Sequence, residues 1–211
     1  ELETILGGLR TMLELRLLAR RVRATSSGLF VLDGSFYSAL LEVNRLLVRY
    51  AQDARGGSRP EWWAPFTALI EAFFAEQDWR LVLSCRRVIA HPKQATAADD
   101  VAQLAPYLSG TVTDRTLWST VLEPGEHSLP VPLIKQDRPH LLTGYRSPGL
   151  PDFAEHRAAI EQGYGQLYVI YYRPEEHGPA YRLELPAGLI AREPLGAALA
   201  TFRGALRVTA V

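Results

Sequence analysis

The sequence of 211 residues contains only one cysteine, Cys85, and one methionine. A single cysteine excludes a disulfide framework and any zinc site built from several thiolates. No apolar run approaches the roughly 20 residues that a membrane-spanning helix needs, and the first residues do not have the layout of a signal peptide. These absences predict a soluble protein without contact to a membrane, and a reducing cytoplasm is the expected location.

An excess of charge of either sign is also missing, because 23 basic residues balance 23 acidic residues. A net charge of zero excludes a uniformly basic surface, so any nucleic acid must bind in a local groove or with the help of a partner. Lysine is scarce, and 21 of the 23 basic residues are arginine. The planar fork of arginine suits phosphate groups, although a GC-rich genome produces the same bias without functional meaning.

Several catalytic motifs are absent from the chain. It has no Gly-x-Ser-x-Gly elbow, no Gly-x-x-x-x-Gly-Lys phosphate loop and no dinucleotide-binding fingerprint. This argues against serine hydrolase, nucleotide hydrolase and dehydrogenase chemistry by the usual folds. The five histidines have no close metal-ligand spacing. Cys85 ends an apolar segment, and we interpret it as a small buried hydrophobic residue rather than a nucleophile.

The periodicity of apolar residues predicts helices that alternate with strands. Helices are expected over 1–23, 36–52, 63–76, 97–108 and 194–205. Strands are expected over 29–32, 79–85, 165–173 and 180–185. The first strand reads as a central one buried on both faces, and the last two as a hairpin. The pattern predicts an α/β sheet in one domain over residues 1–211, with a Pro- and Gly-rich connection or lid at 123–151.

Asp33 is the candidate functional residue with the clearest position. It ends the first predicted strand, and Gly34 and Ser35 follow it, which allows a sharp turn that leaves the carboxylate at the edge of the sheet. Ligands of α/β sheets bind at that edge, and carboxylate oxygens are preferred ligands of hard divalent cations. The simpler alternative, which the tripeptide alone favours, is that Asp33 only caps the following helix.

Glu14 lies at the edge of the apolar stripe of the first helix, one turn after Arg10. Its simpler interpretation is a surface ion pair with Arg10, worth less than about 1 kcal/mol. A role as a metal ligand requires the helix to pass beside the end of strand 29–32, so that Glu14 and Asp33 share an ion.

The predicted hairpin carries several tyrosines and arginines. Strand alternation places Tyr168 and Tyr172 on one face and Tyr171 on the other, and it puts Arg182 and Glu184 on a common face. Tyrosines in strands usually serve packing, but aromatic rings interleaved with arginines also form platforms for stacked bases and phosphates.

In combination, these segments resemble the NurA nuclease family over nearly the whole chain. The resemblance depends on the helix bearing Glu14 and on the segments FVLDGS (30–35), TDR (113–115), LEPGEHS (122–128), YVIYYR (168–173) and YRLELP (181–186). It implies an RNase H-like fold, with a mixed sheet flanked by helices, and a homodimer. It also implies a manganese-dependent nuclease, with Mg²⁺ as the other candidate metal, that acts on DNA ends with the hexameric HerA translocase. The expected process is end resection for DNA repair by homologous recombination.

The resemblance also implies roles for individual residues. Asp33 is similar to the aspartate of the family's second Asp-Gly-Ser motif and Glu14 to its metal-binding glutamate, so both are expected metal ligands and catalytic residues. The first Asp-Gly-Ser motif is expected upstream of residue 1, where it supplies another ligand. Late in the chain the family uses a tyrosine and a basic residue near the active site. We choose Tyr172 and Arg182 for these, with rivals at Tyr168, Tyr171 and His177.

The sequence therefore predicts a phosphodiesterase of the two-metal type, in which carboxylates bind divalent cations that activate water and stabilise the leaving oxygen. In this scheme Arg182 holds a phosphate, and the tyrosines stack on or orient the DNA strand. A noncatalytic DNA-binding or adaptor subunit of the translocase is the alternative, and a conventional RNase H-like resolvase is a third. Asp114 and Arg115 match a family pattern whose role is either catalytic or structural.

Overall fold

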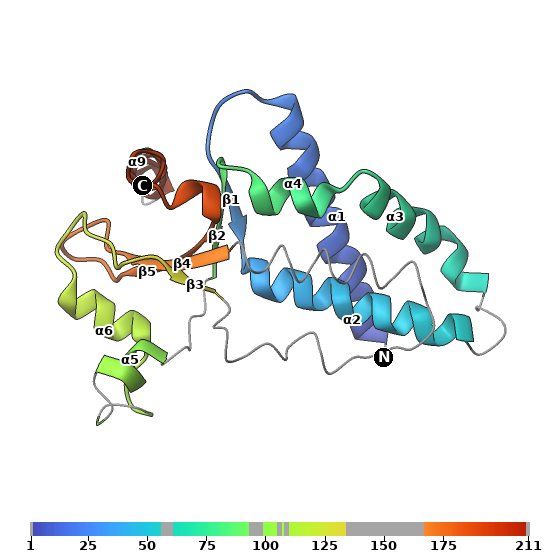
Figure 1. The fold of residues 1–211 in the computed structure, drawn as a ribbon, viewed down its shortest axis with the longest axis horizontal. Coiled ribbons are helices and arrows are strands. Elements are labelled where there is room, and N and C mark those ends of the chain that lie inside the picture. Colours follow the sequence, from blue (N-terminus) through green and yellow to red (C-terminus); the bar gives the residue numbers. More distant parts are fainter. Residues whose placement is uncertain are drawn as a thin grey trace.

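The computed structural model describes residues 2–55, 61–92, 99–104, 107, 110–133 and 167–209. These residues form a five-stranded mixed sheet flanked by helices, which confirms the expected α/β fold (Figure 1). Residues 56–60 of the predicted turn and residues 134–151 of the predicted lid lie outside the described part. No helix among the described residues is both long and apolar enough to cross a membrane.

The sheet has the strand order β1-β2-β5-β4-β3. Its strands are β1 (Phe30–Asp33), β2 (Val88–His91), β3 (Val131–Pro132), β4 (Leu167–Tyr172) and β5 (Tyr181–Pro186). β1 and β2 run parallel, whereas the other neighbouring pairs are antiparallel. The carboxyl ends of β1 and β2 therefore meet at one edge of the sheet, where Asp33 and His91 are direct neighbours in the register.

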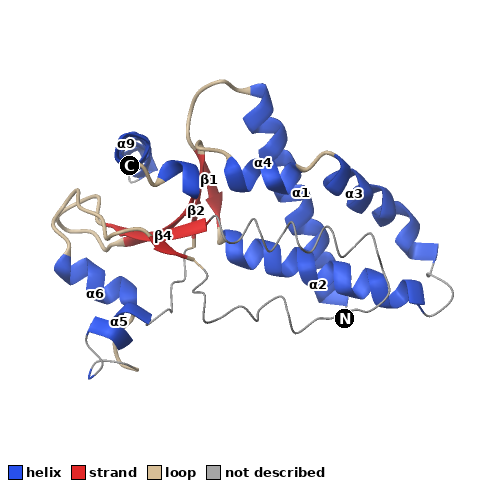
Figure 2. Cartoon of the chain, viewed as in Figure 1, coloured by secondary structure: helices blue, strands red, loops and turns tan. Residues whose placement is uncertain are grey.

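Helices cover both faces of the sheet (Figure 2). They are α1 (Leu2–Ala24), α2 (Phe36–Arg55), α3 (Ala64–Ala75), α4 (Asp78–Ser84), α5 (Asp99–Leu104), α6 (Asp114–Val121) and α9 (Arg192–Thr209), with short 3-10 turns at Glu61–Trp63 and Ala187–Leu189. α1 to α4 pack together on one side of β1 and β2, and α9 lies on the other (Figure 1). The sheet thus separates the hydrophobic core formed with α1 to α4 from the one formed with α9.

Strand alternation assigns side chains to the two cores. Ala90 joins the core formed by α1 to α4, whereas its neighbour Ile89 packs with α9. On β4 and β5, Ile170 and Leu183 face α9 as well, together with Tyr172. The faces expected for the hairpin residues from alternation are therefore confirmed, and the hairpin itself is the β4–β5 pair.

Two contacts fix how α1 sits on its neighbours. A Cβ atom at Gly8 would lie 2.5 Å from the Cβ of Leu46, so only glycine permits this close approach of α1 to α2. Asp78 at the start of α4 is fully buried, and its carboxylate accepts a 2.5 Å hydrogen bond from Arg23 of α1. A buried carboxylate needs such a partner, because its desolvation is otherwise uncompensated.

The strand predicted at 79–85 is wrong, because this segment is helix α4. Trp79, Val82 and Leu83 are buried with helical spacing, so the apolar run packs one face of a short helix rather than both faces of a strand. The strand of this region is β2, which begins at Val88. Cys85 follows a helix instead of ending a strand, and it is half-buried against the core rather than fully buried.

The prediction of a central first strand is also wrong. β1 is an edge strand of the sheet that the described residues form, and its burial alternates. Phe30 and Leu32 pack on the core, whereas Val31 and Asp33 are exposed. The helices expected at 1–23, 36–52, 63–76 and 194–205 are confirmed with small differences at their ends, and α5 lies within the range expected at 97–108.

Candidate functional site

Asp33 stands exposed at the carboxyl end of β1, immediately before α2. Gly34 has φ of 140°, a conformation that L side chains rarely adopt, so the turn after Asp33 requires glycine. The backbone N–H of Gly34 donates to the carbonyl of His91 at 3.2 Å, which attaches the turn to β2. The structure therefore places the Asp33 carboxylate at the sheet edge by a fixed backbone path.

Ser35 holds the other side of this turn through hydrogen bonds. Its hydroxyl donates to the carboxylate of Glu184, with its Oγ 2.8 Å from Oε1 and 3.0 Å from Oε2. The same Oγ accepts a hydrogen bond from the backbone N–H of Ser38 at 3.2 Å, in the manner of an N-cap for α2. One hydroxyl thus joins the start of α2 to the middle of the sheet.

Glu184 is the buried centre of this arrangement, with no exposed side-chain surface. Besides Ser35, it accepts a hydrogen bond from the backbone N–H of Tyr37 at 3.4 Å and from Arg182 Nη2 at 3.2 Å. Burial raises the pKa of Glu184, while Arg182, Ser35 and the backbone N–H groups at the start of α2 act in the opposite direction. The carboxylate of β5 therefore clamps the turn that carries Asp33.

This clamp is the main feature that sequence reasoning missed. Strand alternation predicts only that Glu184 shares a face with Arg182, whereas its hydrogen-bond partner Ser35 lies 149 positions away in the sequence. A signal was present, because Glu184 is an acidic residue between two leucines of an apolar strand. Its partner could not be read from the sequence, since it depends on the pairing of β5 with β2 through Ala90.

His91 is a second residue that the sequence did not single out. It is the register neighbour of Asp33, so both side chains leave the sheet on the same face. The His91 ring lies 5.2 Å from the ring of Tyr181 and 5.8 Å from that of Phe202 of α9. Asp33 therefore belongs to the face of the sheet that α9 covers.

Glu14 is exposed on α1, with its Oε1 3.6 Å from Arg10 Nε. This is the surface ion pair that its spacing suggested. Carboxylate oxygens such as those of Asp33 and Glu14 suit a hard cation like Mn²⁺ or Mg²⁺. Among the residues that the structure describes, however, no three His, Cys, Asp or Glu side chains gather closely enough to hold a metal ion. The described residues thus fit such an ion in donor chemistry and supply only part of a ligand set.

Tyr172 and Arg182 lie on opposite faces of the hairpin. The Tyr172 side chain packs with the α9 core, whereas Arg182 points to the face of Glu184. The residue paired with Arg182 in the register is Tyr171, which is buried and whose ring stacks on Trp118 with centroids 6.2 Å apart. The two residues chosen from the sequence are therefore not brought together. Of their rivals, Tyr168 is half-buried and His177 is exposed.

Asp114 and Arg115 make contacts that hold the fold. The buried Asp114 carboxylate accepts a 2.8 Å hydrogen bond from the backbone N–H of Val101 in α5. Arg115 Nε donates to the carbonyl of Ala180 at 3.2 Å and so attaches α6 to the β4–β5 hairpin. These contacts give both residues a structural role.

Comparison with known proteins gives one match. A family model described as the NurA domain matches residues 3–203, which is nearly the whole chain. No curated protein and no solved structure matches the chain significantly.

Proposed function

Because the chain belongs to the NurA family of nucleases, which act with HerA, we propose that it is a divalent-metal-dependent deoxyribonuclease. The proposed reaction is hydrolysis of a DNA phosphodiester bond during end resection for homologous recombination. The observation that carries the proposal is the exposed Asp33 carboxylate at the end of β1, on a turn clamped by Ser35 and Glu184. A rigidly presented carboxylate at that edge of an α/β sheet is suited to ligand binding.

Asp33 and Glu14 are the proposed ligands of Mn²⁺ or Mg²⁺, each on its own side of β1, and the bound metals would activate water and stabilise the leaving oxygen. The pair of Glu14 with Arg10 is no obstacle, because an exposed pair at this spacing is worth only about 0.3–0.5 kcal/mol. Glu14 can therefore leave Arg10 at little cost. The remaining ligands in this proposal are water, DNA phosphate and an acidic residue of a first Asp-Gly-Ser motif.

Arg182 is the proposed phosphate ligand. One of its Nη atoms binds Glu184, whereas its Nε is buried without a hydrogen-bond partner among the described residues. A guanidinium with N–H groups left over can donate to a phosphate oxygen while it keeps its hydrogen bond to the carboxylate. Tyr172 is proposed to orient the DNA strand from the opposite face of the hairpin.

Titration of Mn²⁺ into the full-length protein separates this proposal from a noncatalytic adaptor subunit. We expect saturable Mn²⁺ binding that Asp33→Asn and Glu14→Gln each weaken at least tenfold, together with loss of DNA cleavage. Glu3→Gln is the matched control, because Glu3 is also an exposed glutamate on α1. A protein that binds no Mn²⁺ and cuts no DNA, with or without the translocase, would support the adaptor.

The proposed partner is a HerA-type hexameric translocase, and the proposed assembly is a homodimer. The support from composition is the net charge of zero, which gives weak long-range attraction to DNA. Cleavage should be strongly stimulated by the translocase with ATP, and sedimentation of the full-length protein should give the mass of a dimer. Equal cleavage rates with and without the translocase would contradict the proposal that a HerA-type translocase is the partner.

A further inference from the structure

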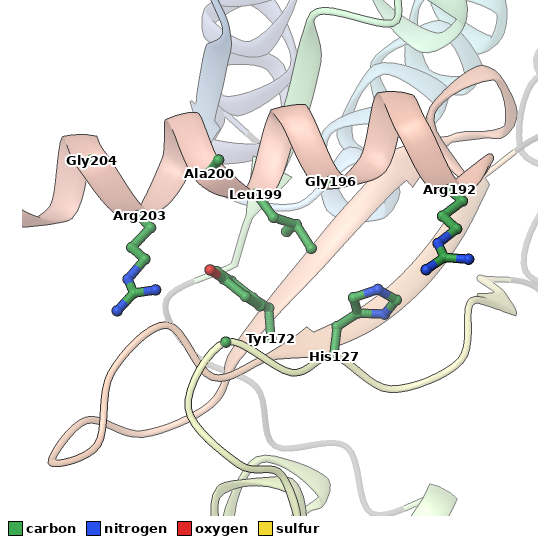
Figure 3. Close-up of a pocket in the computed structure, with 9 residues that line it drawn as sticks. His127, Tyr172, Arg192, Gly196, Leu199, Ala200, Arg203 and Gly204 are labelled. Carbon is green, nitrogen blue, oxygen red and sulfur yellow. The ribbon is translucent and has the colours of Figure 1, made fainter.

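A groove of about 620 Å³ lies along α9, between this helix and the segment that carries His127 (Figure 3). Tyr172 of β4 forms part of its wall, and Figure 3 shows its hydroxyl directed toward α9. Neither Asp33 nor Glu14 lines the groove. It is therefore a feature separate from the proposed metal ligands.

The groove carries positive charge at both ends. Arg192 and Arg203 line it, and both side chains extend from α9 toward the side of His127 and Tyr172 (Figure 3). With about 1.5 Å rise per helical residue, their positions are about 16 Å apart along the axis. Within the described part of the chain, neither arginine forms an ion pair, and Arg203 Nε is buried without a hydrogen-bond partner. Among the residues that the structure describes, no carboxylate lines the groove, so its charge is complementary to an anion.

The shape of the groove comes from small residues on α9. Gly196 and Gly204 both line it, and a Cβ atom at either position would meet no other atom within 4 Å. Open space above a helix backbone lets a ligand approach closely between the two arginines. The volume is that of a site for a small ligand, about 300–1,000 Å³, and it excludes a DNA duplex. A thin, extended ligand with spaced negative charges matches it best.

Aromatic side chains lie between α9 and Asp33 on the same face of the sheet. His91 is the register neighbour of Asp33, and its ring contacts Phe202, which directly precedes Arg203 on α9. Tyr181 is the third ring of this cluster, 5.2 Å from His91 and 5.8 Å from Phe202. A row of aromatic rings thus lies between Arg203 of the groove and Asp33 of the candidate site.

We propose that the α9 groove binds the phosphodiester backbone of one DNA strand and directs that strand toward Asp33. The proposal rests on the proposed nuclease function and adds the substrate class, a single strand, and the surface that holds it. Arg192 and Arg203 each bind a phosphate, and Tyr172 and His127 contact the strand between them.

Binding of a fluorescent single-stranded oligonucleotide, measured with EDTA present over a range of NaCl concentrations, tests the groove without any cleavage. Arg192→Ala/Arg203→Ala should weaken binding at least tenfold at low salt. It should also reduce the slope of log K against log salt by about 1.4, since each phosphate contact on a single strand contributes about 0.7. Arg20→Ala/Arg21→Ala is the matched control, because both arginines are exposed on α1. Parental affinity and slope in the groove variant would overturn the proposal.

A second pair of variants tests the groove without removing an arginine. Gly196→Glu and Gly204→Glu place a negative charge in open space, so we expect a folded protein with at least tenfold weaker binding. Ala197→Glu and Ala205→Glu are the controls, because both positions are exposed on α9 and do not line the groove, and they should bind like the parent. Unchanged binding in Gly196→Glu and Gly204→Glu would contradict the proposal.

The outcomes also distinguish this proposal from the proposed function. Asp33→Asn should bind the oligonucleotide like the parent while cutting nothing. If the parent protein binds DNA through the groove but does not cut it, only the proposed nuclease function is refuted. If the parent protein cuts DNA and the groove variants bind DNA as it does, only the proposed role of the groove is refuted. Equal weakening of duplex and single-strand binding would overturn the assignment to a single strand. Loss of stimulation by the translocase with unchanged DNA binding would identify a protein-docking surface instead.

Discussion

Replacing Ser35 by alanine should destabilise the protein by about 2–4 kcal/mol. The loss of a helix N-cap costs about 1 kcal/mol, and a hydrogen bond to a charged group contributes about 1.5–3 kcal/mol. Ser35 provides both, because its Oγ accepts from Ser38 and donates to the fully buried Glu184. For a chain of this size about 2–4 °C of melting temperature accompany each kcal/mol, so the melting temperature should fall by about 5–15 °C.

The size of this effect should depend on pH, because Ser35 lowers the raised pKa of Glu184. A carboxyl group whose pKa is raised in the fold favours folding below its ordinary value of 4.5, and this contribution is lost as pH rises through the folded pKa. Without Ser35 the folded pKa of Glu184 rises further, so more folding free energy is lost as the pH rises. The destabilisation by Ser35→Ala should therefore be smallest in acid and grow toward neutral pH.

Urea unfolding of the parent and Ser35→Ala at several pH values between about 4 and 8 measures this effect. Ser38→Ala is the control, because Ser38 is exposed and contributes only its backbone N–H to the cap. In a Glu184→Gln background the cost of Ser35→Ala should fall toward the value of about 1 kcal/mol for the cap alone. A cost below about 0.5 kcal/mol, or one independent of pH and of Glu184, would refute the clamp.

Three further changes test the packing around the site by chemical denaturation. Asp78→Asn should cost about 1.5–3 kcal/mol, because the partly exposed Arg23 loses a charged hydrogen-bond acceptor, and a cost under about 0.5 kcal/mol would contradict this. Gly8→Ala should cost about 1–3 kcal/mol, since its Cβ would overlap Leu46, and a stabilised variant would disprove the close contact. Asp114→Ala should cost about 1–3 kcal/mol and expose α5 to hydrogen exchange, because a backbone donor loses its acceptor.

The elements that could be predicted from the sequence are those with long local patterns. α1 and α2 each contain several turns of apolar spacing, and the β4–β5 hairpin follows from alternation on both sides of a turn. α4 was mistaken for a strand because it has only seven residues, and an apolar run of that length fits either structure. Whether β1 is a central or an edge strand depends on which strands pair with it, and no local sequence pattern contains that information.

The candidate site divides in the same way. The turn at Asp33 was predictable, because Gly34 and Ser35 follow it directly. The clamp by Glu184 was not, since it needs β5 to pair with β2 on the face where α2 begins. Strand alternation predicts which residues of one strand share a face. Whether Tyr172 and Arg182 lie on the same face also depends on the register between β4 and β5, which pairs Arg182 with Tyr171.

The cleavage of DNA by Asp33→Asn in Mn²⁺ tests the central claim most directly. Asparagine keeps the size of the side chain and removes only the anionic metal ligand. The full-length variant should retain the parent's melting temperature and single-strand affinity, and its single-turnover cleavage rate should fall at least a thousandfold. Cleavage at the parent's rate would contradict the claim that Asp33 is a metal ligand of this nuclease.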